Sequence, residues 1–520
     1  MLRFFNRQFA IILVAGCAHA FSMAWPVNYL LPFGQSSSAM QLFAMMLLAW
    51  QLNGAKTKKQ GAVIGWLFAC AMQVATWWWL FISLHTYGGL ATPLAVIAVV
   101  GLAAFLALYY AAACAAFVAL APANMTGRAV LFAALWLLAE LCRVRLFTGF
   151  PWGEGGYAHL SGLLDTFISY VGVHGLTFLS AMVAFSIVWG RFVPLTLVFL
   201  LSILLPNGKL KNSIDPIVIS APFTVTLLQG NIAQDEKFQP TGGIPDALAW
   251  YKSQLLAATT SLVVTPETAI PLLPGQLPEG YLDALVNRFM KPAPGAAQTA
   301  ALIGIPLGNS QQGYTNSAIA LKPSTSNTIY QYDKHHLVPF GEFVHPLFKW
   351  FLAIVNIPLA DFNSGSTTQP SLIWQGQRIA PNICYEDLFG EELVARFIDP
   401  AAAPTIMVNI SNIAWFGNTI AIDQHLNISR MRAIEFERPM VRATNTGATA
   451  IIDHTGRVTH LLPRHTRGVL VGEVEGRSGI TPYAWWAARF GLWPWRVLIA
   501  AIVLGASCAR FYWAKGRFDR

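Results

Sequence analysis

Charged side chains are scarce in this chain. Of its 520 residues, 11% are charged and 55% are hydrophobic, whereas an ordinary soluble domain carries about 25% charged residues. The composition therefore excludes a wholly soluble globular protein. The scarcity is uneven, because residues 1–205 are nearly continuous apolar runs and residues 223–478 contain acidic, basic and amide side chains throughout. We expect a membrane-embedded region followed by a polar domain.

Cysteine is also sparse. The six cysteines stand at positions 17, 70, 114, 142, 384 and 508, and no two have the Cys-x-x-Cys spacing of a structural zinc site. We expect no metal and no cofactor. Five of the six lie in or beside apolar runs, where a thiol is a small buried hydrophobe. Cys384 alone belongs to the polar domain, and it is either a reactive thiol or an inert core residue.

Three further features are missing. The polar domain has no basic stripe interleaved with aromatic residues, no internal repeat and no low-complexity tract. The chain's net charge of +9 comes largely from lysine and arginine residues that flank the apolar runs. Such a distribution is typical of membrane orientation, and nucleic-acid binding is not expected.

The apolar runs are long enough to cross a membrane, since a spanning helix needs about 20 mostly apolar residues. Seven candidates precede the polar domain, with centres near residues 17, 43, 73, 105, 135, 175 and 197, and an eighth centres near 502. We therefore expect about eight transmembrane helices. Four regions follow: a bundle over 1–205, a linker over 206–222, a polar domain over 223–478, and an interfacial segment, last helix and tail over 479–520.

Basic residues predict the orientation of these helices, because cytoplasmic loops are enriched in lysine and arginine. With eight spans, nearly all the basic residues beside the spans fall on one side; Arg143 and Arg145 are the exceptions. Both termini are then cytoplasmic, and the polar domain is periplasmic in a bacterial inner membrane. The stretch "ILVAGCAHA" allows an alternative, a cleaved signal peptide with processing at Cys17. The six spans that follow it favour a first transmembrane helix.

Polar residues within the apolar region are few. Glu140 and Arg143 stand near the end of the fifth span and can pair, and intramembrane charges are costly and often functional. The stretch "TGFPWGEGGY" contains glycine and proline, which predicts a re-entrant loop. The aromatic stretch over 481–496 is typical of an interfacial belt, with a lipid entrance as the alternative.

The polar domain alternates strand-like and helix-like segments. Strand-like runs occupy 224–229, 261–267, 301–306, 317–323, 405–411, 440–445, 448–453 and 469–474. Apolar residues recur at helical spacing over 245–260, 280–290 and 424–439. Continuously apolar strands are typical of sheets buried on both faces, and their alternation with helices predicts a layered α/β sandwich.

Three reactive side chains stand at the ends of strand-like runs. Glu267 lies in "VVTPETAIP", Lys334 in "YQYDKHHLVPFGEF" and Cys384 in "APNICYED". A thiolate nucleophile needs a base to remove its proton and a cation or N–H donor to hold the oxyanion. These residue types could supply all three functions, but their spacing alone cannot bring them together. Each also has a structural interpretation, as a helix-start acid, a surface charge and a core cysteine.

With their flanks, these stretches resemble the nitrilase or carbon–nitrogen hydrolase superfamily, and more closely its membrane-embedded apolipoprotein N-acyltransferase family of bacteria. The resemblance covers essentially the whole chain, from "LFTGFPWGEGGY" and "LLQGNIAQ" through "TPETAIP" and "NICYED" to "NISNIAWFGNT". It implies a multi-pass α-helical membrane protein that carries an α/β nitrilase-like αββα sandwich.

The resemblance also implies a reaction. A cysteine takes an acyl chain from a membrane phospholipid, usually phosphatidylethanolamine, and passes it to the N-terminal amine of an S-diacylglyceryl-cysteine lipoprotein. Cys384 matches the nucleophile, Glu267 the general base and Lys334 the cation that stabilises the oxyanion. A thioester intermediate divides one difficult transfer into two easier steps. We expect a monomer.

Further positions match supporting residues of the family. Glu342 is expected to orient Lys334 or the active-site loop. Tyr385 is expected to contribute its backbone N–H to the oxyanion. For Glu386 two roles remain open, positioning of the amine or fixing of a mobile loop.

Aromatic residues match the family with two departures nearby. Trp415 and Phe416 match a loop over the site. Phe238 stands where many relatives carry tryptophan, so a packing or lid role is retained but an indole N–H bond is lost. Ile413 stands where the family usually has aspartate, so any role of that acid is absent.

Two other functions are compatible with part of the sequence. A membrane-tethered amidase would share the three catalytic residues and use water as the acceptor. A transporter with an external binding domain predicts polar residues recurring within the spans. Here these residues cluster near 140–145, which disfavours a transport pathway.

Overall fold

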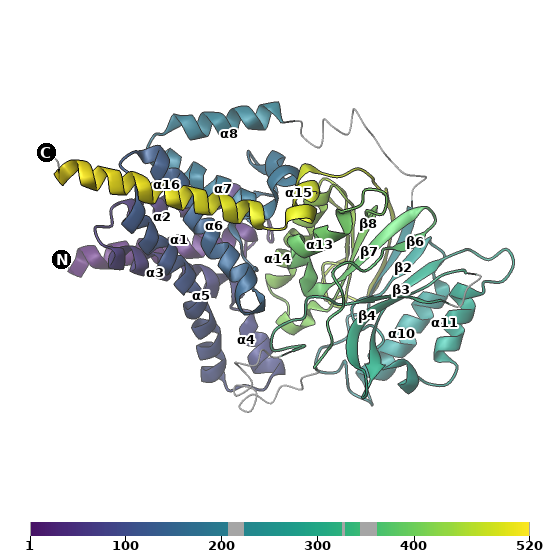
Figure 1. Cartoon of the computed structure of the whole chain (residues 1–520). Helices are drawn as coiled ribbons and strands as arrows, with labels where there is room; N and C mark the ends of the chain where they lie inside the picture. The colour runs from purple at the N-terminus through teal and green to yellow at the C-terminus, as the bar shows by residue number, and fades with distance from the viewer. Residues whose placement is uncertain (1, 206–222, 325–327, 344–360, 519–520) are drawn as a thin grey trace. The chain divides into compact units, whose positions relative to one another are not determined.

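A computed structural model describes residues 2–205, 223–324, 328–343 and 361–518 of the protein. The predicted linker over 206–222 lies outside these residues. The described chain forms two compact units (Figure 1). Residues 2–81, 91–205 and 490–518 make the first unit, and residues 82–90 join the polar region up to residue 489 to make the second.

The first unit is helical. Its helices are α1 (Leu2–Met23), α2 (Ser38–Asn53), α3 (Lys58–Trp77), α5 (Thr92–Leu120), α6 (Met125–Arg145), α7 (Ile168–Val188), α8 (Phe192–Leu204) and α16 (Trp493–Phe518), with a three-residue helix α4 (Leu80–Ile82) after α3. Helix α3 packs against α1 and α5, and α6 packs against α7. Each of the eight predicted apolar runs is therefore helical.

Fewer than eight of these helices have the length and composition of a membrane span. Among the described residues, α5, the segment Asp165–Val188 and α16 qualify, and α3 with residues Leu80–Tyr87 would be a fourth if this pair, bent by 61°, crosses as one. Helices α8 and α2 contain 13 and 16 residues. At 1.5 Å per residue such helices rise about 20–24 Å, less than the hydrocarbon thickness of about 30 Å. The eight-span prediction is therefore not confirmed.

The stretch predicted as a re-entrant loop contains no α-helix, only parts of two short 3₁₀ turns (Leu146–Thr148 and Gly155–His159), and polar side chains hold it. The Arg143 guanidinium donates to the carbonyl oxygens of Phe150 and Trp152 at 3.0 and 2.7 Å. The Glu140 carboxylate accepts from the Gly155 N–H at 3.1 Å and from the Thr177 hydroxyl at 2.7 Å. Glu140 and Arg143 thus take separate partners rather than pairing, because each satisfies backbone groups that an apolar environment cannot.

The second unit contains two six-stranded sheets. The first sheet has the order β12-β1-β2-β3-β4-β5 and the second β11-β10-β9-β8-β7-β6. The strands of the first are β1 (Phe223–Gln229), β2 (Leu262–Val264), β3 (Ala300–Asn309), β4 (Gly313–Leu321), β5 (Tyr330–Asp333) and β12 (Gly468–Val474). Those of the second are β6 (Leu372–Trp374), β7 (Gln377–Ile383), β8 (Ile406–Ser411), β9 (Met440–Thr444), β10 (Ala450–Ile452) and β11 (Val458–Leu461).

Helices cover the outer face of each sheet (Figure 1). Helices α10 (Gly243–Ala257) and α11 (Tyr281–Met290) pack on the first sheet through one apolar cluster. Helices α13 (Gly390–Leu393), α14 (Ala421–Phe436) and α15 (Pro482–Phe490) pack on the second. A third cluster, which includes Val225, Val264, Ile383 and Val408, fills the space between the sheets. This confirms the predicted layered α/β sandwich.

Parallel pairing determines where the strand ends meet. Strand β2 is parallel to β1 and β3, and β8 is parallel to β7 and β9. The carboxyl ends of parallel strands lie at one edge of a sheet, where ligand sites form. Glu267 follows β2, Cys384 follows β7 and Asn412 follows β8, so the sequence of each strand delivers its polar residue to such an edge.

Candidate active site

Cys384 occupies a sharp turn directly after β7. Its φ angle is 54°, in the left-handed region that is unfavourable for a residue with a Cβ. The Cys384 carbonyl accepts hydrogen bonds from Asn409 Nδ2 at 3.3 Å and His425 Nε2 at 3.2 Å. Asn409 is itself held by Asn382 Oδ1 at 2.6 Å. Strained backbone persists where its surroundings fix it, and here side chains from β7, β8 and α14 do so.

The His425 ring is a neutral donor in this arrangement. Its Nδ1 lies 3.3 Å from Arg442 Nη2, which can only donate, so the proton is on Nε2 and points at the Cys384 carbonyl. Burial, together with the Arg442 charge, holds the pKa of His425 well below its usual value. His425 therefore fixes the turn and does not serve as a base for the thiol.

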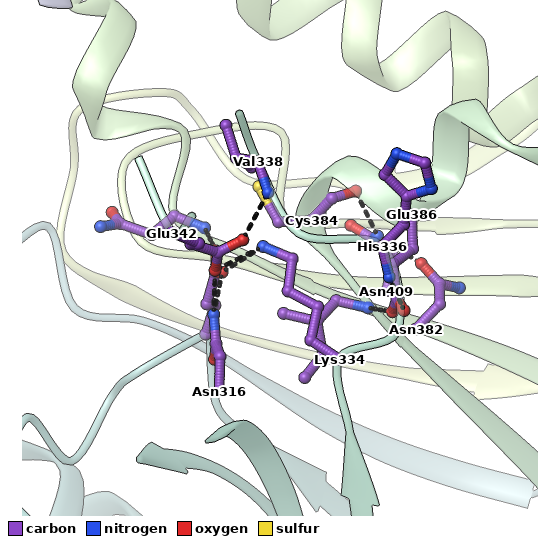
Figure 2. Close-up of polar contacts among 12 residues, drawn as sticks. Asn316, Lys334, His336, Val338, Glu342, Asn382, Cys384, Glu386 and Asn409 are labelled. Atoms are coloured by element: carbon purple, nitrogen blue, oxygen red, sulfur yellow. Dashed lines mark hydrogen bonds and ion pairs between the residues drawn. The ribbon is translucent and has the colours of Figure 1, made fainter. Parts of the chain in front are cut away.

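Two carboxylates, one ammonium and one amide form a buried cluster beside the turn. Lys334 Nζ lies 3.1 Å from Glu267 Oε1 and 2.9 Å from Glu342 Oε1. Asn316 Nδ2 donates to the same two oxygens at 2.8 and 2.7 Å. Figure 2 shows the Lys334 and Asn316 side chains converging on the Glu342 carboxylate, with the Cys384 sulfur nearby. The cluster unites two of the three predicted catalytic residues, Glu267 and Lys334.

The charges of this cluster stabilise one another. Burial raises the pKa of Glu267, but the ammonium groups of Lys334 and Lys237 and the Asn316 amide outweigh it, so the net pKa is lowered. Burial alone would lower the pKa of Lys334, but the carboxylates of Glu267 and Glu342 raise it above its ordinary value. Glu267 is therefore ionised and Lys334 protonated at neutral pH.

The thiol itself is protonated at rest. Burial and, to a smaller extent, the Glu267 carboxylate raise the pKa of Cys384 to about 12, although the Lys334 ammonium opposes this increase. A neutral thiol next to an ionised carboxylate can react only if the base removes the proton as the sulfur attacks. The electrostatics thus favour general-base catalysis over a stable thiolate.

Glu342 touches both groups that it was expected to orient. Its Oε1 pairs with Lys334, and its Oε2 accepts the Val338 N–H at 2.8 Å. The carboxylate therefore closes the turn after β5 and holds the ammonium within that turn.

Glu386 is enclosed by hydrogen-bond donors. Its Oε1 accepts from the N–H groups of His335 and His336 at 2.6 and 3.3 Å, and its Oε2 accepts from the Ile383 N–H at 2.5 Å. The Tyr332 hydroxyl lies 2.9 Å from both oxygens. These contacts support the second of the two predicted roles, fixing of a loop, because they join the Cys384 turn to the segment after Lys334.

The predicted aromatic residues differ in exposure. Tyr385 is buried, with its ring 5.2 Å from that of Phe389. Trp415 is 37% exposed and Phe238 is 53% exposed, while Ile413 is buried. Phe416 is half-buried beside Trp415 in a short 3₁₀ turn, Ile413–Phe416.

The loop that carries Trp415 packs against residues 82–90. The Ser83 hydroxyl donates to the Trp415 carbonyl at 2.7 Å, and the Tyr87 and Trp415 rings meet edge to face at 5.8 Å. By their sequence, residues 82–90 fall within the predicted bundle over 1–205, with no expected link to this loop. Their polar side chains follow the apolar run of α3, which is the signal that could have separated them from it.

Three residues of the site were not predicted. Asn316 bridges the two carboxylates, the Asn412 N–H donates to Glu267 Oε2 at 2.9 Å, and Lys237 Nζ donates to the Glu267 carbonyl at 3.1 Å. Amide and lysine side chains have no periodic or motif signature of such roles. Among the described residues, no group of three or more His, Cys, Asp and Glu side chains is arranged to hold a metal ion.

The sandwich and its site define a carbon–nitrogen hydrolase domain. Residues 224–483 match the family model described as carbon–nitrogen hydrolase, and residues 11–186 match the apolipoprotein N-acyltransferase N-terminal domain. A crystal structure of a carbon–nitrogen hydrolase from Helicobacter pylori G27 covers 53% of this chain and 95% of its own, with 15% identity and a TM-score of 0.36.

Whole-chain relatives make the assignment more specific. An apolipoprotein N-acyltransferase from Verminephrobacter eiseniae is 54% identical, with 92% of each chain covered. Another from Ralstonia nicotianae is 41% identical over 85% of each chain. The chain belongs to the apolipoprotein N-acyltransferase family, and it is an acyltransferase.

Proposed function

We propose that this enzyme transfers an acyl chain from a membrane phospholipid, through a thioester on Cys384, to the N-terminal amine of a diacylated lipoprotein. One observation carries the mechanism: an ionised Glu267 and a protonated Lys334 form one buried cluster whose charges act on the Cys384 thiol. The names of the relatives support a lipoprotein as the acceptor. Phosphatidylethanolamine is the expected donor.

In the first half-reaction, Cys384 Sγ attacks the ester carbonyl of the phospholipid while Glu267 takes the thiol proton. The carbonyl oxygen becomes an oxyanion, which the Lys334 ammonium and the Tyr385 N–H stabilise. The intermediate collapses when the glycerol oxygen leaves and recovers the proton from Glu267. The products are a lysophospholipid and an acyl thioester.

In the second half-reaction, the lipoprotein amine attacks the thioester carbonyl. Glu267 accepts a proton from the amine, the same donors hold the oxyanion, and the sulfur leaves. The departing thiolate takes the proton from Glu267, which restores the starting state. The product is an amide, so the lipoprotein gains a third acyl chain.

The location of this chemistry follows from the substrates. Both are anchored in a bilayer, and a catalytic domain joined to apolar helices at both of its ends stays close to them. We place the domain in the periplasm of a bacterial inner membrane, with both termini cytoplasmic. The exposed rings of Phe238 and Trp415, and the half-buried ring of Phe416 next to Trp415, are suited to contact with acyl chains.

The mass of the Cys384 peptide tests this proposal. Cleavage after Arg378 and Arg396 releases residues 379–396, which contain no cysteine other than Cys384. After incubation with phosphatidylethanolamine alone, this peptide should gain one acyl chain, and Cys384→Ser should gain none. Cys508→Ser, which removes an exposed thiol, serves as the matched control and should acylate normally.

A second stage identifies the acceptor. Addition of a diacylated lipopeptide should discharge the adduct and yield a triacylated product. Release of free fatty acid in place of this product would instead indicate the amidase-like use of water. An unmodified Cys384 peptide in an enzyme that still acylates the lipopeptide would overturn the thioester mechanism.

A further inference from the structure

Lys237 is a buried lysine that the reaction described above does not use. It lies between β1 and α10, and it is 3% exposed. Its ammonium donates to the Glu267 carbonyl oxygen at 3.1 Å. In the part of the chain that the structure describes, no other hydrogen bond of this ammonium occurs. Lysine is almost never this buried without a charged partner.

A ladder of amide side chains fixes the segment that carries Lys237. Asn445 exchanges hydrogen bonds with the backbone of Ile232 at 3.0 and 2.8 Å. Asn412 Nδ2 donates to Gln234 Oε1 at 2.8 Å, and its backbone N–H donates to Glu267 Oε2. The ladder thus holds the Lys237 segment and the Glu267 carboxylate in one framework.

The charges of the site explain why a second ammonium is needed. Glu267 and Glu342 supply two negative charges, and Lys334 supplies one positive charge. Lys237 brings the sum to zero. When the Cys384 proton passes to Glu267, the negative charge moves from Glu267 to the sulfur, and the total charge of the site stays at zero. Without Lys237 the buried site would keep a net negative charge, which is costly.

Other charged groups near these residues are compensated separately. Glu386 is enclosed by backbone N–H donors, as described above. Asp235 and Glu236, which precede Lys237, are exposed, so water screens them. Burial lowers the pKa of Lys237 to about 8, although the charge of Glu267 opposes this decrease. The ammonium is therefore charged at pH 7 and largely neutral above pH 9.

We propose that Lys237 is a positioning residue of the active site, whose buried ammonium balances the two carboxylates and keeps Glu267 ionised as the proton acceptor for Cys384. This inference rests on the proposed function of Glu267 as the base. The residue acts through Glu267 and the thiol, with no contact to a substrate required.

Alkylation of Cys384 by iodoacetamide in the full-length, detergent-solubilised enzyme tests this role. The rate is read from residues 379–396 by mass spectrometry, so the other cysteines do not contribute. Loss of the Lys237 charge should raise the pKa of the Cys384 thiol by about one unit or more. The Cys384 thiol of Lys237→Met should therefore react with iodoacetamide about tenfold more slowly at pH 7. Lys237→Arg keeps the charge and should react within about twofold of wild type, because guanidinium stays protonated.

Lys322 provides a matched control. Its ammonium also donates to a backbone carbonyl, that of Ile373, at 2.6 Å, but at the far end of β4 from Asn316. Lys322→Met removes the same charge and the same type of hydrogen bond. It should leave the alkylation rate of Cys384 unchanged.

The pH profile separates a charge effect from a packing effect. As pH rises through about 8, the wild type loses the Lys237 charge, whereas the arginine variant does not. At pH 9.5 the wild type should therefore react about tenfold more slowly than Lys237→Arg, although the two agree at pH 7. This comparison uses only wild type and Lys237→Arg, so it remains possible even if Lys237→Met does not fold.

Two results would overturn the proposal. One is a folded Lys237→Met enzyme that alkylates at the wild-type rate. The other is a constant ratio of wild type to Lys237→Arg from pH 7 to 9.5. Alkylation requires no phospholipid, so either result would count against the role of Lys237 and not against acylation of Cys384. Absence of the acyl adduct after incubation with phospholipid would instead reject the proposed function itself.

Discussion

Substitution of Glu386 by glutamine should destabilise the domain and slow both half-reactions. The carboxylate accepts hydrogen bonds from four donors, three backbone N–H groups and the Tyr332 hydroxyl. Glutamine replaces one acceptor oxygen by an NH₂ group. Whichever way the amide is turned, this group faces a backbone N–H, and a donor then meets a donor.

The size of the effect follows from these contacts. A hydrogen bond to a charged group contributes roughly 1.5–3 kcal/mol, and a buried N–H left without an acceptor costs roughly 1–3 kcal/mol. Together the two effects amount to roughly 2.5–6 kcal/mol. Burial raises the pKa of Glu386, which offsets part of the gain from its charge, so we expect about 3 kcal/mol, toward the lower end of that combined range. For a domain of this size that corresponds to a decrease in Tm of about 6–12 °C.

Thermal unfolding in detergent and separate rates for the two half-reactions provide the assay. Glu386→Gln should lower the Tm and slow acylation of Cys384 as well as transfer to a lipopeptide. Tyr332→Phe is the graded control, because it removes one donor and should lower stability by about 1.5 kcal/mol. If Glu386→Gln instead kept the wild-type Tm and acylated Cys384 normally but failed in transfer, Glu386 would act on the amine and our interpretation would be wrong.

Three further outcomes are expected. Asn316→Leu removes two hydrogen bonds to carboxylates and should slow acyl-adduct formation at least tenfold, taking roughly 1.5–3 kcal/mol for each bond; a wild-type rate would contradict a role in the cluster. The pKa of Glu267 is lowered in the folded state. The contribution of the ionised carboxylate to stability is therefore complete above the unfolded pKa of about 4.3 and is lost as pH falls through the lower folded pKa. The Tm measured from pH 7 to 3 should decrease less in Glu267→Gln than in wild type. Asp246→Asn breaks an exposed pair with Arg467 and should change stability by less than about 1 kcal/mol, which a single melting curve checks.

Much of the fold could be predicted from local patterns. All eight strand-like runs contain a strand, and the three helix-like segments become α10, α11 and α14. The strand-like runs did not include β5, β6, β7 and β11. Strands β5, β6 and β11 have only three or four residues, too few for a distinct alternation of apolar and polar residues. Strand β7 is longer but contains Pro381, a residue that is rare inside strands. Helices were found in the apolar region as expected, but counting spans needs helix ends, and ends are set by caps and bends rather than by composition.

Part of the site, like part of the fold, could be predicted from local sequence. The local sequence singles out Glu267, Lys334 and Cys384 through the short motifs that contain them, although only the strand before Glu267 was among the strand-like runs. The structure supplies the residues that make them work together. Asn316 reaches Glu267 over a sequence separation of 49 residues, and the Asn412 N–H reaches it over 145. A local sequence pattern cannot relate residues that are so far apart along the chain.

The sequence by itself determined the division into an apolar and a polar region, the layered class of the polar domain and the three reactive side chains. Each of these depends on composition, periodicity or a motif, which are local. Only the tertiary structure decided that Glu386 is enclosed by hydrogen-bond donors, that Asn316 joins two carboxylates and that Lys237 is buried beside Glu267. Those facts depend on which strand ends meet at one edge of the sandwich, where burial strengthens every charge and requires a partner for each polar group.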